Sequence, residues 1–373
     1  MKKTRVLLVQ LGANGDCLMV TTIARQIKRD FPGCHLTWAI SHKCRPMIEN
    51  NPDVDEVWDV DYKAEECPHG DGYRRLQQEI EDRCAKGDFD YVFNTQIYPF
   101  NVSKFDGSTR SSMFHIYPKP IRVDKHPVLR LFDSEVQKTE QFAAAHRLRE
   151  FKHVIILECA PGSKQSKLNQ QRGVALAQKW VEKRSDTVVV VSTNIPFQSP
   201  HPRIIDGSCV SLRENVALSH HATMFAGCSS GITWLLTSEE AKQLPMVLFL
   251  DPAALGSRFA SVVYDFDYWG LPSDHIIETG KDDIEEMAEV VLCALDDFDN
   301  ARRCYHETFK PHFWDFLIFI DYRSYKRCLN VFGTCRLFLA RNRFGWSDFF
   351  DVGRLARVLL FLCEEAVRVM RKR

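Results

Sequence analysis

Short apolar strands alternate with helical segments along most of this chain, and that alternation restricts the fold more than any other feature. Residues 5–9 (Arg-Val-Leu-Leu-Val) predict a buried strand, and the apolar spacing that follows predicts a helix over residues 17–31. Further strands are predicted at residues 35–40 and 57–60. Strands that alternate with helices are typical of right-handed βαβ units, so we expect a parallel sheet.

The same pattern restarts after about residue 150. Residues 153–157 predict a strand, and residues 187–192, with four consecutive valines, predict a strand at the centre of a parallel sheet. A length of 373 residues also suits two domains better than one. We therefore expect two α/β domains, residues 1–150 and 151–300, with a boundary near residues 134–152 and a helical tail over residues 301–373.

Composition excludes several classes of protein. The 45% hydrophobic content excludes a disordered chain, and 49 basic against 49 acidic side chains argue against a chain devoted to nucleic acid. The first apolar run ends at Gln10 without a cleavage site, and no apolar stretch reaches the roughly 18 residues of a membrane span. The 13 cysteines form no Cys-x-x-Cys pair, which favours buried thiols in a reducing cytoplasm over metal ligands.

The first strand leads into a small-residue turn at residues 12–16 (Gly-Ala-Asn-Gly-Asp). The turn lacks the three-glycine spacing of a dinucleotide site and the Lys-Ser/Thr ending of a Walker loop. What remains is one carboxylate, Asp16, at the start of a helix. Two interpretations are open: Asp16 is a helix cap, or it is a reactive carboxylate that faces the gap between the domains.

Two similar turns follow strands of the second half. Residues 161–164 (Pro-Gly-Ser-Lys), with Lys167 and Arg172 beyond, combine backbone amides with cations, which suits a diphosphate or a solvated basic loop. Residues 228–231 (Cys-Ser-Ser-Gly) precede a predicted helix. Their two serines favour ligand binding over a plain strand-to-helix turn.

These motifs together resemble glycosyltransferase family 9, the heptosyltransferase family of two-domain, metal-independent, inverting sugar transferases. The resemblance spans roughly residues 4–300 and rests first on the opening strand and its Gly-Ala-x-Gly-Asp turn. Residues 36–38 and 48–57 are similar to the family's N-terminal domain, and the turns at residues 160–163 and 228–231 to its C-terminal motifs. The resemblance implies two Rossmann-like domains that face a cleft, the GT-B fold.

The resemblance also implies the chemistry. Asp16 would be the general base that deprotonates an acceptor hydroxyl, and Lys164 or Lys167 would neutralise the leaving diphosphate without a metal or other cofactor. The donor would be a nucleotide-diphosphate sugar, and the acceptor a glycan or a lipid-linked molecule of bacterial surface polysaccharide or lipopolysaccharide. The implied substrate-binding residues are Gly12, Asn14, Gly15, Gly162, Ser163, Lys164, Lys167, Ser229, Ser230 and Gly231.

The second-half motif departs from the family pattern Asp-Ser-Gly-x-x-His. Ser229 stands at the place of its aspartate and Trp234 at the place of its histidine. This departure favours a donor other than ADP-heptose. It also leaves open an inactive relative that binds sugar nucleotides or glycans. A further alternative is an epimerase of nucleotide sugars, which also uses two such domains.

The tail carries the basic charge of the chain. Residues 323–373 hold 12 Lys/Arg and 4 Asp/Glu, and apolar residues recur at helical spacing from Leu355 to Val369. An Arg-rich amphipathic segment with Trp and Phe can lie in an anionic membrane interface. Alternatively, the tail packs back across the two domains. We expect a cytoplasmic protein that can contact the inner face of the bacterial inner membrane through this tail.

Overall fold

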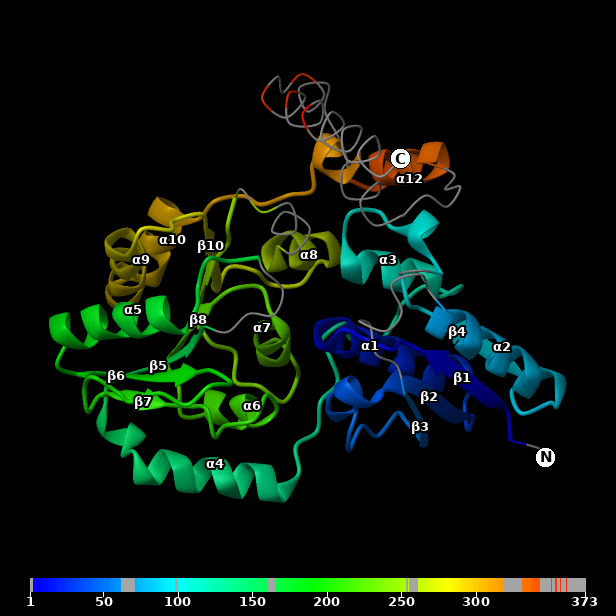
Figure 1. Cartoon of the computed structure of the whole chain (residues 1–373), viewed down its shortest axis with the longest axis horizontal. Coiled ribbons are helices and arrows are strands. Elements are labelled where there is room, and N and C mark those ends of the chain that lie inside the picture. The colour runs from blue at the N-terminus through cyan, green and yellow to red at the C-terminus, as the bar shows by residue number, and fades with distance from the viewer. Residues whose placement is uncertain are drawn as a thin grey trace, which may run out of the picture.

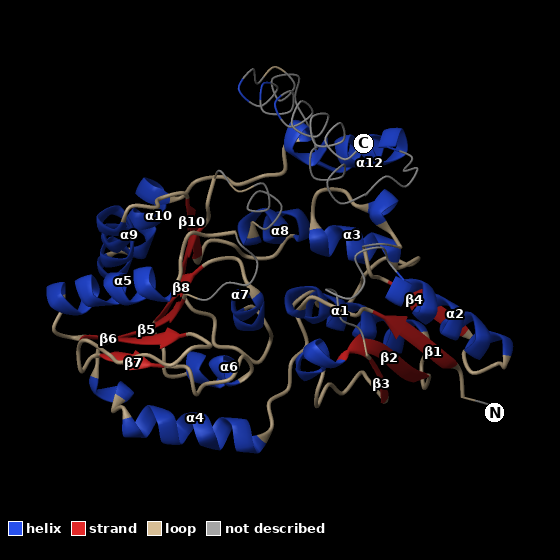
Figure 2. Cartoon of the chain, in the orientation of Figure 1, coloured by secondary structure: helices blue, strands red, loops and turns tan. Residues whose placement is uncertain are grey.

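The computed structural model describes residues 3–61, 71–97, 100–159, 165–252, 254, 261–317 and 331–342, and the single positions 350, 353, 356 and 360. Two parallel sheets organise these residues (Figures 1 and 2). The first has the strand order β3-β2-β1-β4 and the second the order β10-β9-β8-β5-β6-β7. The two α/β units predicted from the alternation of strands and helices are therefore confirmed.

The first half contains four strands and the helices that connect them. Its elements are β1 (Arg5–Val9), α1 (Asn14–Asp30), β2 (His35–Ser41), the 3-10 helix η1 (His42–Met47), β3 (Glu56–Val60), α2 (Asp71–Ala85), β4 (Tyr91–Asn94), the 3-10 helix η3 (Val102–Lys104) and α3 (Thr109–Ile116). Helix α1 begins three residues before the predicted start at residue 17, directly in the glycine turn. The turn and the helix that we expected to follow it are thus one element.

The second half contains six strands. Its elements are α4 (Asp133–Ala145), the 3-10 helix η4 (Leu148–Glu150), β5 (His153–Glu158), α5 (Gln170–Lys183), β6 (Thr187–Ser192), β7 (Ile204–Asp206), α6 (Glu214–Ser219), β8 (Met224–Gly227), α7 (Gly231–Leu236), β9 (Met246–Phe249), α8 (Val262–Trp269), β10 (Ile276–Thr279) and α9 (Ile284–Asp296). Strands β5 and β6 are buried along their whole length, because helices cover both faces of the sheet.

The stretch near residues 134–152, expected to be the domain boundary, contains helix α4. This helix runs along the lower side of the second half (Figure 1) and is tied to it at the loop before α6. The guanidinium of Arg213 lies 2.7 Å from Glu135, and the ammonium of Lys138 lies 2.9 Å from Glu214. Arg213 also donates to the backbone oxygens of Pro46 and Arg130, at 2.8 and 2.7 Å. One arginine therefore fastens the linking helix to both halves.

The chain returns to the first half after α10 (Phe298–Tyr305), and α12 (Val331–Asn342) lies beside α3 (Figure 1). Phe338 of α12 is fully buried against Phe316, with ring centroids 3.9 Å apart, and Arg341 pairs with Asp106 at 2.9 Å. Residues 331–342 therefore pack against the first half, which favours the second of the two alternatives for this part of the tail. Most of the predicted amphipathic segment from Leu355 to Val369 lies outside the described residues.

Candidate functional site

The turn at the start of α1 carries the first candidate residue. The Asp16 carboxylate accepts a hydrogen bond from the backbone N–H of Ala13, at 3.3 Å. Asp16 therefore makes the capping contact that one of the two interpretations required. A carboxylate in this first turn is also favoured by the positive end of the helix dipole.

The structure brings this turn against the serine turn of the second half. A Cβ built on Gly231 would lie 3.5 Å from the Cβ of Asn14, so the starts of α7 and α1 are in van der Waals contact. A Cβ on Gly15 would lie 2.9 Å from Cδ1 of Trp234, one turn further along α7. Of the implied binding residues, Asn14 and Gly15 of the first half therefore meet Gly231 of the second half at one junction.

The serine turn is largely buried. Ser229 is 3% exposed and Ser230 8% exposed. The Ser230 hydroxyl caps α7 by accepting from the backbone N–H of Ile232, at 3.2 Å. The hydroxyl of Ser229 and the side-chain oxygen of Asn14 are buried and have no hydrogen-bond partner among the residues that the structure describes. Buried polar atoms of this kind lower the stability of the fold unless a bound group forms hydrogen bonds with them.

The remaining sequence candidates lie elsewhere or are not described. Gly12 lies against a thiol: a Cβ at this position would be 3.2 Å from the sulfur of Cys44. Lys167 is exposed and forms an ion pair with Asp282, and this hydrogen-bonded partner raises its pKa. The Lys167 ammonium must leave Asp282 before it can neutralise a diphosphate. The implied residues Gly162, Ser163 and Lys164 lie outside the described residues.

A buried ion pair crosses between the halves beside the junction, and sequence reasoning missed it. Arg110 of α3 is completely buried, and its Nε lies 3.0 Å from a carboxylate oxygen of Asp265 of α8. The guanidinium also lies over the rings of Trp234 and Phe266, at 5.2 and 5.5 Å. Burial raises the pKa of Asp265 to about 6, although Arg110 opposes the shift. Helix α3 was not predicted, so no sequence signal marked Arg110.

A second missed feature is a buried carboxyl beneath the serine turn. Glu158, the last residue of β5, is 2% exposed and accepts from the backbone N–H and the thiol of Cys228, each at 3.3 Å. Burial raises the pKa of Glu158 to about 7, while hydrogen bonds from Cys228 and Ser230 act in the opposite direction. One signal was present in the sequence: an acidic residue directly follows the apolar run of residues 153–157.

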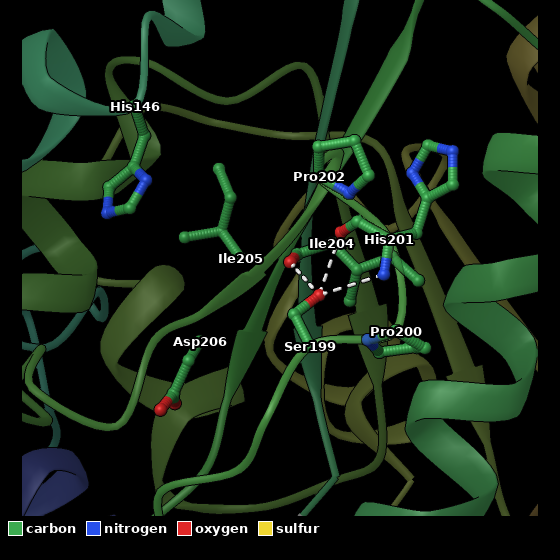
Figure 3. A pocket seen from close by; sticks show the side chains of 8 residues that line it. All are labelled: His146, Ser199, Pro200, His201, Pro202, Ile204, Ile205 and Asp206. Atoms are coloured by element: carbon green, nitrogen blue, oxygen red, sulfur yellow. Dashed lines mark hydrogen bonds between the residues drawn. The ribbon is translucent and has the colours of Figure 1, made fainter.

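A shallow pocket of about 330 Å³ lies at the β7 edge of the second sheet (Figure 3). It is lined by His146, Ser199, Pro200, His201, Pro202, Ile204, Ile205 and Asp206. The Ser199 hydroxyl oxygen lies 2.8 and 2.5 Å from the carbonyl oxygens of His201 and Ile204, to which its single proton can be donated. None of the lining residues belongs to the two turns, and the serine is occupied within its own loop.

Within the described part of the chain, no group of three or more His, Cys, Asp or Glu side chains is arranged to hold a metal ion. Among the same residues, no helix combines the length and the apolar character that crossing a bilayer requires.

No protein-family model matches the chain, and no curated protein matches it. Among solved structures, a glycosyl transferase of family 9 from Veillonella parvula matches with a TM-score of 0.53 and 16% identity, over 81% of this chain and 94% of that one. The E. coli heptosyltransferase WaaC with ADP matches with a TM-score of 0.48 and 11% identity, over 79% and 99%. A putative UDP-N-acetylglucosamine 2-epimerase from Listeria monocytogenes matches with a TM-score of 0.47 and 11% identity, over 83% and 93%.

The first of these matches establishes a shared fold. The two parallel sheets with their covering helices have the GT-B architecture of that glycosyltransferase, so the fold class expected from the sequence is confirmed. At 16% identity the likeness extends to the fold alone.

Proposed function

We propose that this protein is a glycosyltransferase that moves a sugar from a nucleotide-diphosphate donor to a glycan or lipid-linked acceptor. One observation carries the proposal: the carboxylate turn of the first half and the serine turn of the second half meet at one junction, where Gly231 faces Asn14. A sugar transfer needs such a meeting, because the acceptor's base and the donor's anion site must flank one reacting carbon.

In the proposed reaction an acceptor hydroxyl attacks C1 of the donor sugar and gives its proton to the Asp16 carboxylate. The bond from C1 to the phosphate oxygen breaks on the opposite face, and the nucleoside diphosphate leaves with the bonding electron pair. The configuration at C1 is therefore inverted. The position of Asp16 in the first turn of α1 supports its ionised form, because the helix dipole favours negative charge there.

The second half is proposed to hold the donor and to compensate the charge of the leaving group without a metal. The buried Ser229 hydroxyl, which lacks a partner among the described residues, supports a ligand at this turn. The cations come from the loop at residues 160–167, where Lys164 or Lys167 would face the diphosphate. In this division residues 1–150 take the acceptor and residues 151–300 take the donor.

We further propose that the protein works in the cytoplasm at the inner face of a bacterial inner membrane, on surface polysaccharide or lipopolysaccharide. The surplus of eight positive charges over residues 323–373 supports contact with anionic lipid. Two apolar side chains of this segment, Phe350 and Leu360, are 75% and 63% exposed. Apolar groups beside arginines are the composition of interfacial helices.

A second candidate function is a sugar-nucleotide binder without transfer activity. It is favoured by Ser229 and Trp234, which replace the aspartate and histidine of the family motif, and by the way Trp234 packs against Gly15. A binder would keep the donor contacts of the second half but release no nucleoside diphosphate.

The test begins with thermal unfolding of the purified full chain in the presence of ADP-, GDP-, UDP- and CMP-sugars. A donor at a hundredfold excess over its Kd raises the free energy of unfolding by about 2.7 kcal/mol. The donor that stabilises the protein is then incubated with lipopolysaccharide and lipid-linked acceptors, and release of the nucleoside diphosphate is measured.

Asp16→Asn is expected to keep donor binding and to lower transfer by about 100- to 10,000-fold. The control is Asp283→Asn, because Asp283 is the N-cap of α9 and accepts from the N–H of Glu285 at 2.9 Å, so this variant removes a carboxylate from another helix start, away from the junction. Full transfer by Asp16→Asn would refute the proposed base. Binding without transfer in the wild type would favour the binder, and conversion of the donor without any acceptor would favour an epimerase.

A further inference from the structure

Two buried glutamates lie on the same row of the second sheet. Gly227 of β8 and Glu278 of β10 both pair with Leu248 of β9, and Glu158 of β5 lies beside Gly227 on the other side. Residues on one row of a parallel sheet point to the same face. The face in question is the one that α7 and α8 cover.

Each glutamate lies beneath the start of one of these helices. Glu158 contacts Cys228, in the turn before α7. The carboxylate of Glu278 accepts from the hydroxyl of Ser261 at 2.6 Å and from the N–H of Val262 at 2.7 Å, at the start of α8. The two side chains are alike in burial, in sheet face and in pKa, which burial raises to about 7 in both. They differ in the turn that they support.

The packing around Glu158 leaves little freedom for its carboxyl. A Cβ on Gly227 would lie 3.1 Å from the Cβ of Glu158, a closer contact than most Cβ atoms make. Among the described residues, the thiol of Cys228 contacts the carboxyl, and Cys159, the residue that follows the strand, interacts with it electrostatically. No cation among the described residues forms an ion pair with it. An ionised Glu158 is therefore an uncompensated buried charge under the serine turn.

The serine turn also shows a sign of a missing partner. Ser229, next to Cys228 in the chain, is only 3% exposed. Its hydroxyl has no hydrogen-bond partner in the described part of the chain. This observation is independent of Glu158. A buried hydroxyl in this situation has the capacity to form a hydrogen bond with a bound group.

We infer that Glu158 is a positioning residue of the donor site, and that it takes up a proton when a nucleotide-sugar diphosphate binds at the serine turn. The inference rests on the proposed function, which places the donor there. A diphosphate next to the turn adds negative charge close to a buried carboxyl for which the described residues provide no cation. The protonated carboxyl keeps its acceptor oxygens for Cys228 and removes the repulsion.

The raised pKa of Glu158 supports this coupling. Burial raises it to about 7 in the free protein, so near neutral pH about half of the molecules carry an ionised Glu158. An anion raises the pKa further, and binding then consumes a proton. The diphosphate of a nucleotide sugar is a diester and does not titrate in this pH range. The proton that is consumed on binding must therefore be taken up by the protein and not by the ligand.

The experiment is isothermal titration calorimetry of the full chain with ADP-glucose, GDP-mannose and UDP-glucose, in pairs of buffers with different ionisation enthalpies. For a sugar nucleotide that binds, we expect the wild type to take up more than about half a proton near pH 7.5. We also expect its Kd to rise about tenfold between pH 6 and pH 8.5. Glu158→Gln keeps a neutral side chain of the same shape, so its Kd should change less than about twofold over that range.

Glu278→Gln is the matched control, because it removes an equally buried carboxyl from the same row without touching the serine turn. It should bind with the proton uptake of the wild type. Uptake that persists in Glu158→Gln would overturn the inference, and so would a wild type that binds without uptake. If Glu158→Gln does not fold, a wild type that binds without uptake still overturns the inference, and so does a loss of the uptake in Glu278→Gln, which would assign the proton to the other carboxyl.

The two proposals fail in different ways. Proton-coupled binding that depends on Glu158, without transfer to any acceptor, would sustain the inference and refute the transferase. Transfer to an acceptor, together with donor binding that consumes no proton, would support the transferase and overturn the inference. Absence of binding by all three sugar nucleotides at every pH would overturn the inference.

Discussion

The indole of Trp234 lies directly against the backbone of Gly15, where a Cβ would come within 2.9 Å of its Cδ1. The contact joins α7 of the second half to α1 of the first, one residue before Asp16. Real Cβ atoms do not approach carbon atoms this closely, so the glycine is required by the tryptophan. The Gly-x-x-Gly spacing of the first turn therefore has a packing cause in addition to any role in binding.

Gly15→Ala is expected to lower the free energy of unfolding by about 1–3 kcal/mol, because the indole has to move out of a packed interface. The double variant Gly15→Ala/Trp234→Ala should cost less than the sum of the two single variants. Urea unfolding of the four proteins measures this coupling.

Gly231→Ala is the control across the same junction, since its Cβ would make an ordinary contact of 3.5 Å with Asn14. It should leave the free energy of unfolding within about 1 kcal/mol of the wild type. Additive costs for Gly15 and Trp234 would contradict the contact.

The Arg110–Asp265 pair is expected to behave as a buried ion pair. Arg110→Met alone leaves the Asp265 carboxylate without its cation and should cost about 3–5 kcal/mol. The double variant Arg110→Met/Asp265→Leu should cost less than either single variant, because both charges are removed together. Denaturant unfolding of the set tests this.

An exposed ion pair provides the comparison. Arg147 and Glu150 are 72% and 55% exposed, so Glu150→Gln should produce no measurable loss of stability. If Arg110→Met also left the free energy of unfolding unchanged, the Arg110–Asp265 pair would contribute nothing to the association of α3 with α8.

Glu278 should make stability depend on pH. Its pKa is about 7 in the folded protein and 4.5 as the ordinary value. Between these values the folded state binds more protons than the unfolded state, so stability falls as pH rises from about 4.5 to 7. Relative to Glu278→Gln, the wild type should lose roughly 3 kcal/mol over this window.

The measurement is the difference in the free energy of unfolding between the two proteins at pH 5, 6, 7 and 8. Taking the difference removes the contributions of all other titrating groups. A difference that is constant with pH would show that Glu278 ionises normally in the folded chain.

Phe338 should anchor the returning tail. It is completely buried, and a Cβ on Gly107 would lie 2.5 Å from its ring. Phe338→Ala is expected to cost about 3–5 kcal/mol and to expose residues 331–342 to limited proteolysis. Phe350→Ala, at a position 75% exposed, should change neither property. Equal protease resistance of both variants would contradict the anchor.

Much of the fold follows from local sequence patterns. The strands at residues 5–9 and 187–192 were predicted with the bounds that the structure has, because a short apolar run between turns is typical of a buried strand. Helices α3 and α8 were not predicted. Their side chains pack against the opposite half through Arg110 and Asp265, and such contacts leave no simple periodic pattern in their own segments.

Of the candidate site, too, only a part could be predicted from the sequence. The glycine turn with Asp16 and the serine turn were visible in the sequence, since each consists of small residues between a strand and a helix. That Trp234 reaches Gly15 across 219 positions of the chain was not visible. The hydrogen bond from the backbone N–H of Cys228 to the carboxyl of Glu158 was not visible either.

The sequence by itself determined the alternation of strands and helices, the two parallel sheets and the turns that end their first strands, because hydrophobic period and turn chemistry are local properties. Only the tertiary structure decided which turns meet, which carboxyls are buried without a cation and where α12 docks. These outcomes depend on contacts between residues far apart in the chain, and their energies are set by burial and geometry that no local pattern encodes.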